Sequence, residues 1–363
     1  MTIWADSGCD ESIDTNRVVV IGGGPAGCAA AKALGQAGIP VTLVERDGAN
    51  RDKSCGDMFM PGAVAMIKRL GLSRQSLLSI GASFKGVDLL GSGGLLREVM
   101  FPTDPVWILP RRLIDQALRD CLPADVSVLY NILVNGIIKP ANTRLQVCAR
   151  AATGRVIHLR CEAVVLATGA QSALPAQWGI AGVPIIAPSL SAYVRNPGFE
   201  TPSLEFLSAC RPGYRWLFPT AGDEANVGVC SLIGAKGSEL RRRGDHLLDA
   251  YHLADGVRWR GGAGALWSGR GTRWHHDAGV VACGDAAGLA DPITGEGLTA
   301  ALASGWAAGT AVANFLTHRR DPSWLQNYTN RVRDTFAVAY ATSPVRTAWT
   351  QLCGVSGATR RQR

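Results

Sequence analysis

The feature of the sequence that most constrains the fold is a glycine-rich turn between two apolar runs. The first run, residues 18–21, leads directly into the segment GGGPAG at residues 22–27 and an alanine-rich stretch that ends near Gly38. The second run, residues 41–44, ends at Glu45. This order predicts a strand, a tight turn, a helix, a second strand and an acidic residue, which together form one βαβ unit of about thirty residues.

The spacing of the glycines and the acid predicts what this unit binds. Gly22, Gly24 and Gly27 follow the pattern GxGxxG, in which glycine permits a tight turn, close approach of a pyrophosphate and close packing of the helix on the strand. The phosphates would then lie on the positive end of the helix, and Glu45 can accept hydrogen bonds from a ribose. The segment therefore indicates a dinucleotide-binding domain.

A second glycine-rich segment lies further along the chain. After an apolar run at residues 280–282 the sequence reads CGDAAG, and residues 291–298 (DPITGEGL) then precede a long uncharged stretch. Asp285 suits the binding of a polyol, and the backbone N–H groups of residues 295–298 would face a partly negative ring oxygen with a helix dipole behind them. An ordinary capped helix that follows a strand produces the same pattern, so this segment alone leaves both interpretations open.

Length and composition exclude several classes of protein. With 363 residues, of which 47% are hydrophobic and 18% charged, the chain is neither disordered nor a single small core. Its net charge of +8 suits an anionic cofactor or substrate but does not indicate nucleic acid. The ten cysteines include no CxxC pair, which favours a reduced, cytoplasmic protein. Residues 1–16 lack the apolar core of a signal peptide and are expected to form a disordered tail.

One stretch has the length of a membrane span. Residues 297–317 contain no charged side chain, and Gly305 and Gly309 form a GxxxG motif. The stretch is rich in Ala, Gly and Thr rather than in Leu and Ile, which favours a central helix that packs closely on its neighbours over stable membrane insertion. Contact of this helix with a membrane surface stays an alternative.

In this order the two glycine-rich segments resemble those of FAD-dependent oxidoreductases with the p-hydroxybenzoate-hydroxylase fold, over residues 17–316. Two further matches point to the geranylgeranyl-reductase-like branch of these proteins. Residues 53–57 (KSCGD) are similar to its KxCGD segment, and residues 212–219 (PGYRWLFP) are similar to its PxYxWxFP pattern. The resemblance implies FAD as the cofactor and places these residues beside it: Gly22, Gly24, Pro25, Ala26, Gly27, Glu45, Arg46, Cys55, Gly56, Arg112, Val134, Asp285, Pro292, Gly295, Gly297 and Leu298.

The resemblance and the order of the apolar runs together predict an α/β protein. We expect a Rossmann-like FAD-binding domain with a parallel sheet, interwoven with an antiparallel-sheet substrate domain and followed by a C-terminal helix. The predicted boundaries are 17–82, 110–175 and 277–320 for the FAD-binding domain, 83–109 and 176–276 for the substrate-binding sheet, and 321–363 for the C-terminal helical segment.

The aromatic segment at residues 213–219 supplies candidate substrate-binding and catalytic residues. Period-two alternation places Tyr214, Trp216 and Phe218 on one face of a strand. Such a stripe is typical of a core, but the resemblance places it in the substrate pocket. Tyr214 and Trp216 are candidate catalytic residues on this basis. Cys55 is a third candidate because a thiol beside a flavin can donate a proton, with a small packing residue as the alternative.

Other positions depart from the related hydroxylases or form no pattern. Residues 167–172 (ATGAQS) stand where those hydroxylases have an Asp-Gly motif linked to FAD and NAD(P)H, which leaves NAD(P)H, a separate flavin reductase or a ferredoxin as candidate electron donors. The six histidines show no metal-ligand spacing, and His275 and His276 are expected to point to opposite sides of a strand. We therefore expect a small-molecule substrate and no metal.

The sequence leaves the reaction open between two main hypotheses. The first is a monooxygenase that hydroxylates or epoxidises a compact aromatic or unsaturated metabolite through a C4a-peroxyflavin, as the fold and the short sequence after Asp321 favour. The second is a reductase or dehydrogenase of carbon–carbon double bonds of the geranylgeranyl-reductase type, as residues 53–57 and 212–219 favour. A flavin halogenase is a distant third. A flavin-binding module without catalysis is disfavoured, because the sequence builds a substrate sheet over the flavin.

Overall fold

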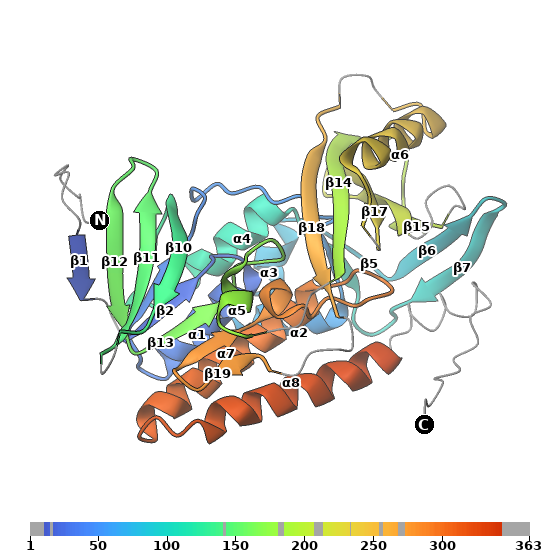
Figure 1. Ribbon diagram of the computed structural model, residues 1–363. Helices are drawn as coiled ribbons and strands as arrows, with labels where there is room; N and C mark the ends of the chain where they lie inside the picture. The colour runs from blue at the N-terminus through green and yellow to red at the C-terminus, as the bar shows by residue number, and fades with distance from the viewer. Residues whose placement is uncertain are drawn as a thin grey trace, which may run out of the picture.

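Six strands form a largely parallel sheet in one half of the protein (Figure 1). The structure is a computed structural model. The structure describes residues 11–14, 17–140, 143–180, 185–206, 213–232, 234–253, 257–267 and 273–342. The strands of this sheet, in spatial order, are β19 (His275–His276), β20 (Val280–Ala282), β13 (Ala163–Leu166), β2 (Val18–Ile21), β3 (Val41–Val44) and β9 (Val126–Leu129). Neighbouring strands are parallel except that β19 is antiparallel to β20.

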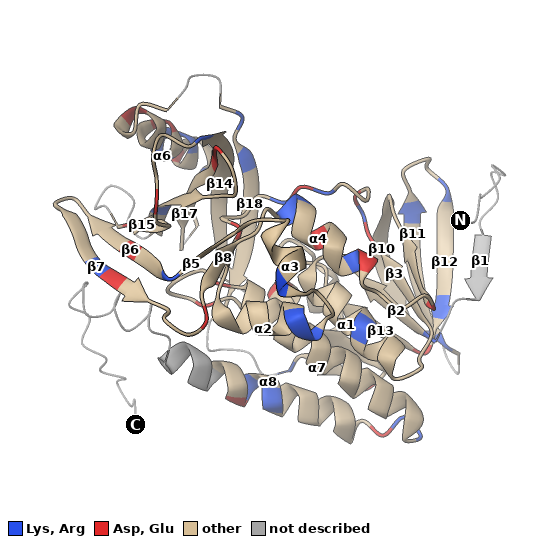
Figure 2. Cartoon of the chain, turned by 180° about the vertical axis from the view of Figure 1, so that it is seen from behind, with Lys and Arg blue, Asp and Glu red and all other residues tan. Residues whose placement is uncertain are grey.

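The predicted βαβ unit is present as β2, α1 (Pro25–Gln36) and β3. All residues of β2 and β3 are buried, as a parallel sheet covered on both faces requires. Figure 2 shows that β2 and its neighbour β13 carry no charged side chain. Gly38, with a φ of 69°, lies just beyond the end of α1, where glycine accepts the left-handed conformation at little cost.

A four-stranded sheet continues the same half of the molecule and corrects part of the predicted tail. Its spatial order is β1 (Glu11–Asp14), β12 (Val156–Cys161), β11 (Leu145–Ala151) and β10 (Ile132–Ile138). Residues 11–14 were expected to be disordered, but they pair in parallel with residues 157–160. The edge of a sheet offers unpaired backbone groups to an extended segment. The amino-acid composition of residues 1–16 gave no indication of this pairing. Residues 1–10 and 15–16 lie outside the described residues.

Residues 126–138 are divided between these two sheets. Asn131 has a φ of 59°, in the left-handed region that asparagine tolerates better than most residues. The chain turns there, so that β9 ends at Leu129 in the parallel sheet and β10 begins at Ile132 in the four-stranded sheet.

Seven strands form the second large sheet, which carries α6 (Gly237–Ala250) on one face (Figure 1). In spatial order they are β18 (Arg260–Leu266), β14 (Ile185–Arg195), β17 (Glu224–Ser231), β16 (Gly213–Pro219), β15 (Ser203–Glu205), β6 (Gly86–Gly91) and β7 (Gly94–Met100). All neighbours are antiparallel except β15 and β6. The predicted fold class, a parallel sheet combined with an antiparallel sheet, is therefore confirmed. These strands fall in residues 83–109 and 176–276, and we propose that those two segments form the substrate domain.

The remaining elements connect and cover the two large sheets. A three-stranded sheet has the order β4 (Met58–Phe59), β8 (Val106–Ile108) and β5 (Ala82–Phe84). The helices are α2 (Pro61–Arg69), α3 (Arg74–Leu78), α4 (Arg111–Asp120), α5 (Leu174–Gln177), the 3-10 helix η2 (Gly284–Ala287), α7 (Leu298–Thr317) and α8 (Ser323–Thr342). The predicted C-terminal segment thus begins with α8, and residues 343–363 lie outside the described residues.

The GxxxG motif of α7 forms a close contact with α1. A Cβ atom added at Gly305 would lie 2.1 Å from the carbonyl oxygen of Ala26, and one added at Gly309 would lie 2.4 Å from that of Ala30. The small residues therefore allow two helix backbones to approach each other inside the protein. Within the described ranges, no helix has both the length and the apolar character that crossing a membrane requires.

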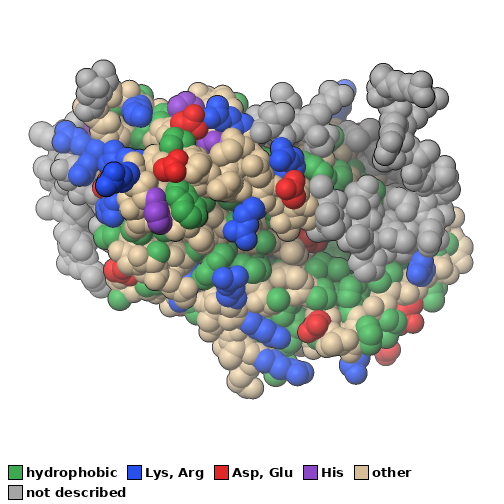
Figure 3. Space-filling view, turned by 90° about the horizontal axis from the view of Figure 1, so that it is seen from below, with side chains coloured by type: hydrophobic (Ala, Val, Ile, Leu, Met, Phe, Trp, Pro, Cys, Tyr) green, Lys and Arg blue, Asp and Glu red, His purple; other side chains and the backbone are tan. Residues whose placement is uncertain are grey.

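On the face seen in Figure 3, basic side chains lie among neutral and acidic ones. Several basic residues pair with acids, as Arg17 and Arg320 do with Glu162 at 3.1 and 2.8 Å.

Candidate functional site

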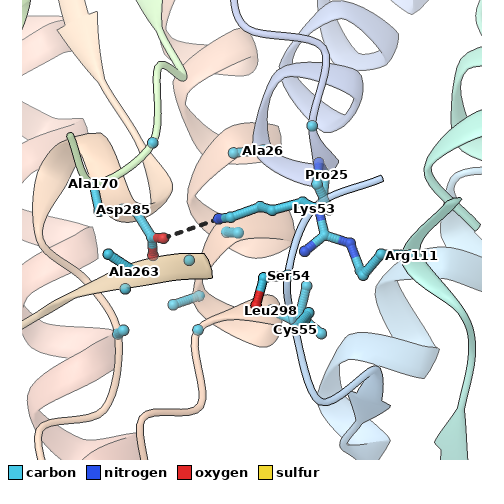
Figure 4. Close-up of a pocket in the computed structure, with 18 of the residues that line it drawn as sticks. Pro25, Ala26, Lys53, Ser54, Cys55, Arg111, Ala170, Ala263, Asp285 and Leu298 are labelled. Carbon is cyan, nitrogen blue, oxygen red and sulfur yellow. Dashed lines mark ion pairs between the residues drawn. The ribbon is translucent and has the colours of Figure 1, made fainter. Parts of the chain in front are cut away.

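One cavity of about 1110 Å³ extends from the glycine-rich turn to the inner face of the seven-stranded sheet. It exceeds the roughly 300–1,000 Å³ of a typical small-molecule pocket, so it has room for a dinucleotide and a second ligand. The sequence-predicted cofactor residues line this cavity except Gly27, Arg112 and Pro292. Figure 4 shows side chains from separate segments of the chain, among them Lys53, Arg111 and Asp285, which converge on it.

The glycine-rich turn has the backbone that a phosphate site needs. Gly22 has a φ of 106°, and a Cβ atom there would lie 2.3 Å from the carbonyl oxygen of Ala167. A Cβ at Gly27 would lie 1.8 Å from the carbonyl oxygen of Gly22, which explains why Gly27 packs behind the turn rather than lining the cavity. Gly24 faces the cavity, and no side chain caps the N-terminus of α1. The uncapped N-terminus of α1 therefore fits a diphosphate.

Glu45 fixes the turn and still has acceptor capacity. Its side chain is buried at the end of β3, where Oε2 accepts a hydrogen bond from the backbone N–H of Gly23 at 2.6 Å and Oε1 accepts one from Asp47 at 3.0 Å. A carboxylate has about four acceptor positions, so ribose hydroxyls can occupy the others. Arg46, the next residue, is exposed and pairs with Asp47 at the rim of the cavity.

Thr168 is a cavity residue that the sequence did not single out. Its Oγ1 atom is buried and has no hydrogen-bond partner in the described part of the chain. The residue follows β13 and lines the cavity next to Gly22. A buried hydroxyl without a partner is costly, so a bound ligand with polar groups at this place would satisfy it. Together with the glycine turn, this atom indicates that the residues present fit a dinucleotide such as FAD.

Asp285 and Lys53 face each other across the cavity. Asp285 belongs to η2, directly after β20, and its Oδ2 lies 3.5 Å from Nζ of Lys53, the pair marked by the dashed line in Figure 4. A Cβ atom added at Gly297 would lie 3.3 Å from Oδ1 of Asp285, so glycine keeps the second oxygen accessible. Two side chains from distant segments thus hold one polar position in the cavity.

The turn before α7 is shaped by two acidic side chains. Oδ1 of Asp291 accepts hydrogen bonds from the backbone N–H groups of Ile293 at 2.7 Å and Thr294 at 2.9 Å. Oε1 of Glu296 accepts one from Thr299 at 2.8 Å, in the first turn of the helix. Burial raises the pKa of Glu296 above its ordinary value. Gly295, Gly297 and Leu298 line the cavity, whereas Pro292 does not.

The structure corrects the predicted role of Arg112. This residue lies on the exposed side of α4, and its neighbour Arg111 lines the cavity instead. The buried face of the helix repeats every three to four residues and contains Arg111, Ile114, Asp115 and Leu118, so residue 112 points to solvent. Arg111 forms a bidentate ion pair with Asp115, in which its Nε and Nη2 donate to the two carboxylate oxygens at 2.7 Å.

The aromatic strand β16 has the two faces that alternation predicted. Tyr214, Trp216 and Phe218 line the cavity, while Leu217 packs under α6. The hydroxyl of Tyr214 donates to the carbonyl oxygen of Thr294 at 2.5 Å, and the indole N–H of Trp216 donates to Oδ1 of Asn226 at 2.8 Å. Both polar groups are therefore engaged, and what these side chains present to the cavity is largely their ring surface.

Cys55 lies in the loop opposite this strand. A Cβ atom at its neighbour Gly56 would lie 2.9 Å from the ring of Phe218, so the absence of a side chain brings the loop against the aromatic surface. The Cys55 side chain lines the cavity. Burial raises the pKa of its thiol, and the nearby Arg111 guanidinium opposes that shift. The group is therefore a thiol rather than a thiolate at neutral pH.

The remaining predictions concern Val134, the two adjacent histidines and metal sites. Val134 of β10 lines the cavity. His275 is buried and His276 exposed, so the prediction of opposite directions is confirmed. No cluster of His, Cys, Asp or Glu with metal-binding geometry occurs among the residues that the structure describes. Sequence reasoning missed Arg51, Arg111, Thr168, Tyr193 and Asn226. Three of them, Arg51, Tyr193 and Asn226, gain their roles from partners far away in the chain.

The fold and the cavity together define a dinucleotide-binding oxidoreductase. The sequence matches the family described as pyridine nucleotide-disulphide oxidoreductase over residues 16–197, half of the chain. The chain belongs to that family. No disulfide joins the cysteines in the described part of the chain. Membership of this family and the fold shared with flavoproteins support FAD as the cofactor.

Comparison with individual proteins confirms the resemblance drawn from the motifs. The chain is 29% identical over 324 residues to the menaquinone reductase of Mycobacterium tuberculosis, an alignment that covers 80% of this chain and 75% of that protein. Its fold is similar to that of a geranylgeranyl bacteriochlorophyll reductase-like protein from Thermoplasma acidophilum, with a TM-score of 0.78, 22% identity and coverage of 90% and 85% of the two chains. It is also similar to p-nitrophenol 4-monooxygenase from Pseudomonas putida, with a TM-score of 0.76, 19% identity and coverage of 96% and 92%.

Proposed function

We propose that the protein is an FAD-dependent reductase that saturates a carbon–carbon double bond in an apolar substrate of the isoprenoid type. The observation that carries the proposal is the position of Cys55. Its side chain lines the same cavity as the aromatic rings of Trp216 and Phe218 and the turn at residues 294–298. A proton donor and an apolar surface therefore share the cavity proposed for the flavin.

The chemistry of such a reduction assigns a role to Cys55. Saturation of a double bond needs a hydride at one carbon and a proton at the other. FAD, when bound and reduced, supplies the hydride. The thiol of Cys55 supplies the proton, since burial keeps it protonated at neutral pH. The thiolate that remains lies near the Arg111 guanidinium, which stabilises its negative charge, until a proton from water restores the thiol.

Tyr214 is better suited to holding the site than to donating a proton. Its hydroxyl hydrogen already binds the carbonyl oxygen of Thr294, which fixes the turn before α7. Burial also raises the pKa of the phenol well above its ordinary value, so release of this proton is unfavourable. We assign Tyr214 to support of the turn and its ring, with those of Trp216 and Phe218, to contact with the substrate.

The comparisons favour a reductase at least as much as the monooxygenase that the sequence placed first. Menaquinone and geranylgeranyl groups, which occur in the names of two of the similar proteins, both contain isoprenoid double bonds. The apolar part of the cavity matches such a substrate, because Val87, Phe101, Leu204 and Leu232 join the aromatic residues there. A double bond in an isoprenoid chain is therefore the substrate class that we propose.

Monooxygenation is the second candidate function. The observation that favours it is the likeness of the whole fold to p-nitrophenol 4-monooxygenase, which covers more of this chain than the reductase-like structure does, 96% against 90%. The same cavity would then take a compact aromatic or unsaturated metabolite beside the flavin.

An anaerobic single-turnover experiment distinguishes the two reactions. The FAD-loaded protein is reduced with dithionite, so that no natural electron donor is needed, and is mixed with geranylgeraniol in heavy water. We expect a product with one double bond saturated and two solvent deuteriums incorporated, formed as the flavin reoxidises. One deuterium comes from the exchangeable Cys55 thiol and the other from the reduced flavin, whose N–H groups exchange with heavy water. The proposal is wrong if the anaerobic flavin stays reduced and the substrate instead stimulates O2 uptake in air with formation of an oxygenated product.

A further inference from the structure

The loop that carries Cys55 is docked on the inner face of the seven-stranded sheet. Asp52 forms an ion pair with Arg260 of β18, and Oγ of Ser54 lies 2.9 Å from Oγ of Ser191 on β14. At the far end of the loop, Asp57 binds the side chains of Tyr193 on β14 and Asn226 on β17. Contacts with the seven-stranded sheet therefore hold the loop at both of its ends and in between, beside the proposed cofactor position.

Asp57 is the most constrained residue of this loop. It is 1% exposed and has a φ of 63°, a left-handed conformation that a residue with a side chain adopts only where its surroundings hold it. Its Oδ2 accepts hydrogen bonds from the hydroxyl of Tyr193 and, at 2.6 Å, from Nδ2 of Asn226. Its Oδ1 accepts one from the backbone N–H of Arg111 at 3.3 Å. Two strands of the sheet and α4 thus meet at one carboxylate.

Asn226 passes this constraint to two candidate residues of the reaction. The side chain is fully buried, and its Nδ2 donates to the carbonyl oxygen of Cys55 at 2.9 Å as well as to Asp57. Its Oδ1 accepts from the indole N–H of Trp216 at 2.8 Å. The orientation of the amide is therefore set, because the carboxylate and the carbonyl need a donor and the indole needs an acceptor.

We propose that Asp57 is a positioning residue for the reduction, which acts through Asn226 to hold the backbone of Cys55 and the ring of Trp216 in one fixed relation. Asp57 itself transfers no proton to the substrate in this scheme. The inference rests on the proposed function for the identity of the reaction, whereas the network itself is tested without turnover.

The network responds to pH in a defined direction. Burial raises the pKa of Asp57 from 3.8 to about 6, and the hydrogen bonds from Tyr193 and Asn226 and the Arg111 guanidinium oppose that rise. The other groups that face it are Cys55 on its own loop and, behind the Tyr193 ring, Arg260 and Asp52. Below about pH 6 the carboxyl group binds a proton and accepts fewer hydrogen bonds, so the positions of Cys55 and Trp216 become less fixed.

The test measures the fluorescence of Trp216 against pH in the FAD-loaded protein. The signal of this residue is the difference between the wild type and Trp216→Phe, measured in parallel in each variant background. We expect a transition near pH 6 in the wild type, its loss in Asp57→Asn, and an upward shift of about one pH unit in Tyr193→Phe, since that variant removes a hydrogen bond that favours the ionised carboxylate. Asp223→Asn, at an exposed turn of the same sheet, serves as the control and should match the wild type.

Kinetics supplies the second measurement. Asp57→Asn should retain FAD and lower kcat by about tenfold to a hundredfold, with a small change in KM, because a misplaced proton donor slows the step without removing the binding surface. If Asp57→Asn does not fold, Tyr193→Phe decides alone. An unchanged transition in Tyr193→Phe overturns the inference. A shifted transition in a protein that reduces no double bond upholds the network and rejects the proposed function.

Discussion

The Nζ atom of Lys53 lies 3.5 Å from Oδ2 of Asp285, so an ion pair joins the loop opposite β16 to the junction after β20. Both side chains line the cavity, and each is largely removed from solvent, with 28% and 17% of its side chain exposed. A carboxylate in this position can accept hydrogen bonds from the hydroxyls of a ribitol chain. The pair thus marks where the loop and the six-stranded sheet would hold the cofactor together.

Replacement of Asp285 by Ala is expected to abolish retention of FAD during purification, because the acceptor for the polyol is removed and Lys53 loses its partner. The ratio of flavin to protein, taken from the absorbance spectrum, measures this. Asp277→Ala changes an exposed carboxylate just before β20 and should leave the ratio unchanged. A fully yellow Asp285→Ala protein would contradict the assignment.

Two glycines of the same turn should respond differently to substitution. Gly22→Ala places a Cβ 2.3 Å from a carbonyl oxygen in a left-handed backbone, and we expect it to lower the free energy of unfolding by more than about 2 kcal/mol. Gly24→Ala brings its Cβ no closer than 3.6 Å to Arg51, so the free energy of unfolding should change by less than about 1 kcal/mol.

FAD binding gives the second half of this comparison. The added methyl group at Gly24 faces the cavity and should weaken FAD binding by about tenfold or more, since the phosphate can no longer approach the turn. Urea denaturation and titration of the FAD-free protein with FAD measure the two effects. Equal FAD affinity in Gly24→Ala and the wild type would reject this turn as the diphosphate site.

Cys55→Ser should slow the proposed reduction by about a hundredfold or more, because a hydroxyl is a far weaker acid than a thiol at the same place. The single-turnover rate of flavin reoxidation measures the change. Cys121→Ser, at the end of α4 and outside the cavity lining, is the matched control and should keep the full rate. Tyr214→Phe should reduce the rate less than Cys55→Ser. Full turnover by Cys55→Ser would exclude the thiol as the proton donor.

The site residues that could be predicted from the sequence lie close to their partners along the chain or follow from a local pattern. The glycine turn and Glu45 are tied to each other by one strand and one helix, so their spacing alone contains the information. The same holds for the two faces of β16, which follow from alternation. Asp57 is different: it meets Asn226 across 169 positions of sequence, and the KSCGD segment gave no indication of that partner. Thr168 likewise gains its place from the neighbouring strand, not from its own surroundings in the chain.

The two arginines at the start of α4 provide a direct test of the corrected assignment. Arg112→Ala should change the free energy of unfolding by less than about 0.5 kcal/mol, as expected for an exposed residue. Arg111→Met removes the bidentate partner of the buried Asp115 and should cost about 3 kcal/mol, since only Arg51, at 3.2 Å, still pairs with that carboxylate. Urea denaturation of both variants measures the difference. Similar losses in the two would contradict the placement of these side chains.

The raised pKa of Asp57 predicts how its contribution to stability depends on pH. The pKa rises from 3.8 in the unfolded chain to about 6 in the folded protein, so the folded state binds the proton more tightly. The resulting stability is fully present below the unfolded pKa and is lost as the pH rises through about 6. A shift of this size corresponds to about 3 kcal/mol.

Comparison of the wild type with Asp57→Asn isolates this effect, because asparagine does not titrate and the remaining carboxylates are common to both proteins. The free energy of unfolding of the wild type minus that of Asp57→Asn should decrease by about 2.4 kcal/mol between pH 4 and pH 7. Urea denaturation at saturating FAD measures it, and Asp223→Asn, an exposed carboxylate that pairs with Arg195, should show a flat difference. Parallel pH profiles for the wild type and Asp57→Asn would mean that Asp57 titrates alike in the folded and unfolded states, and would contradict the prediction that burial outweighs the hydrogen bonds from Tyr193 and Asn226.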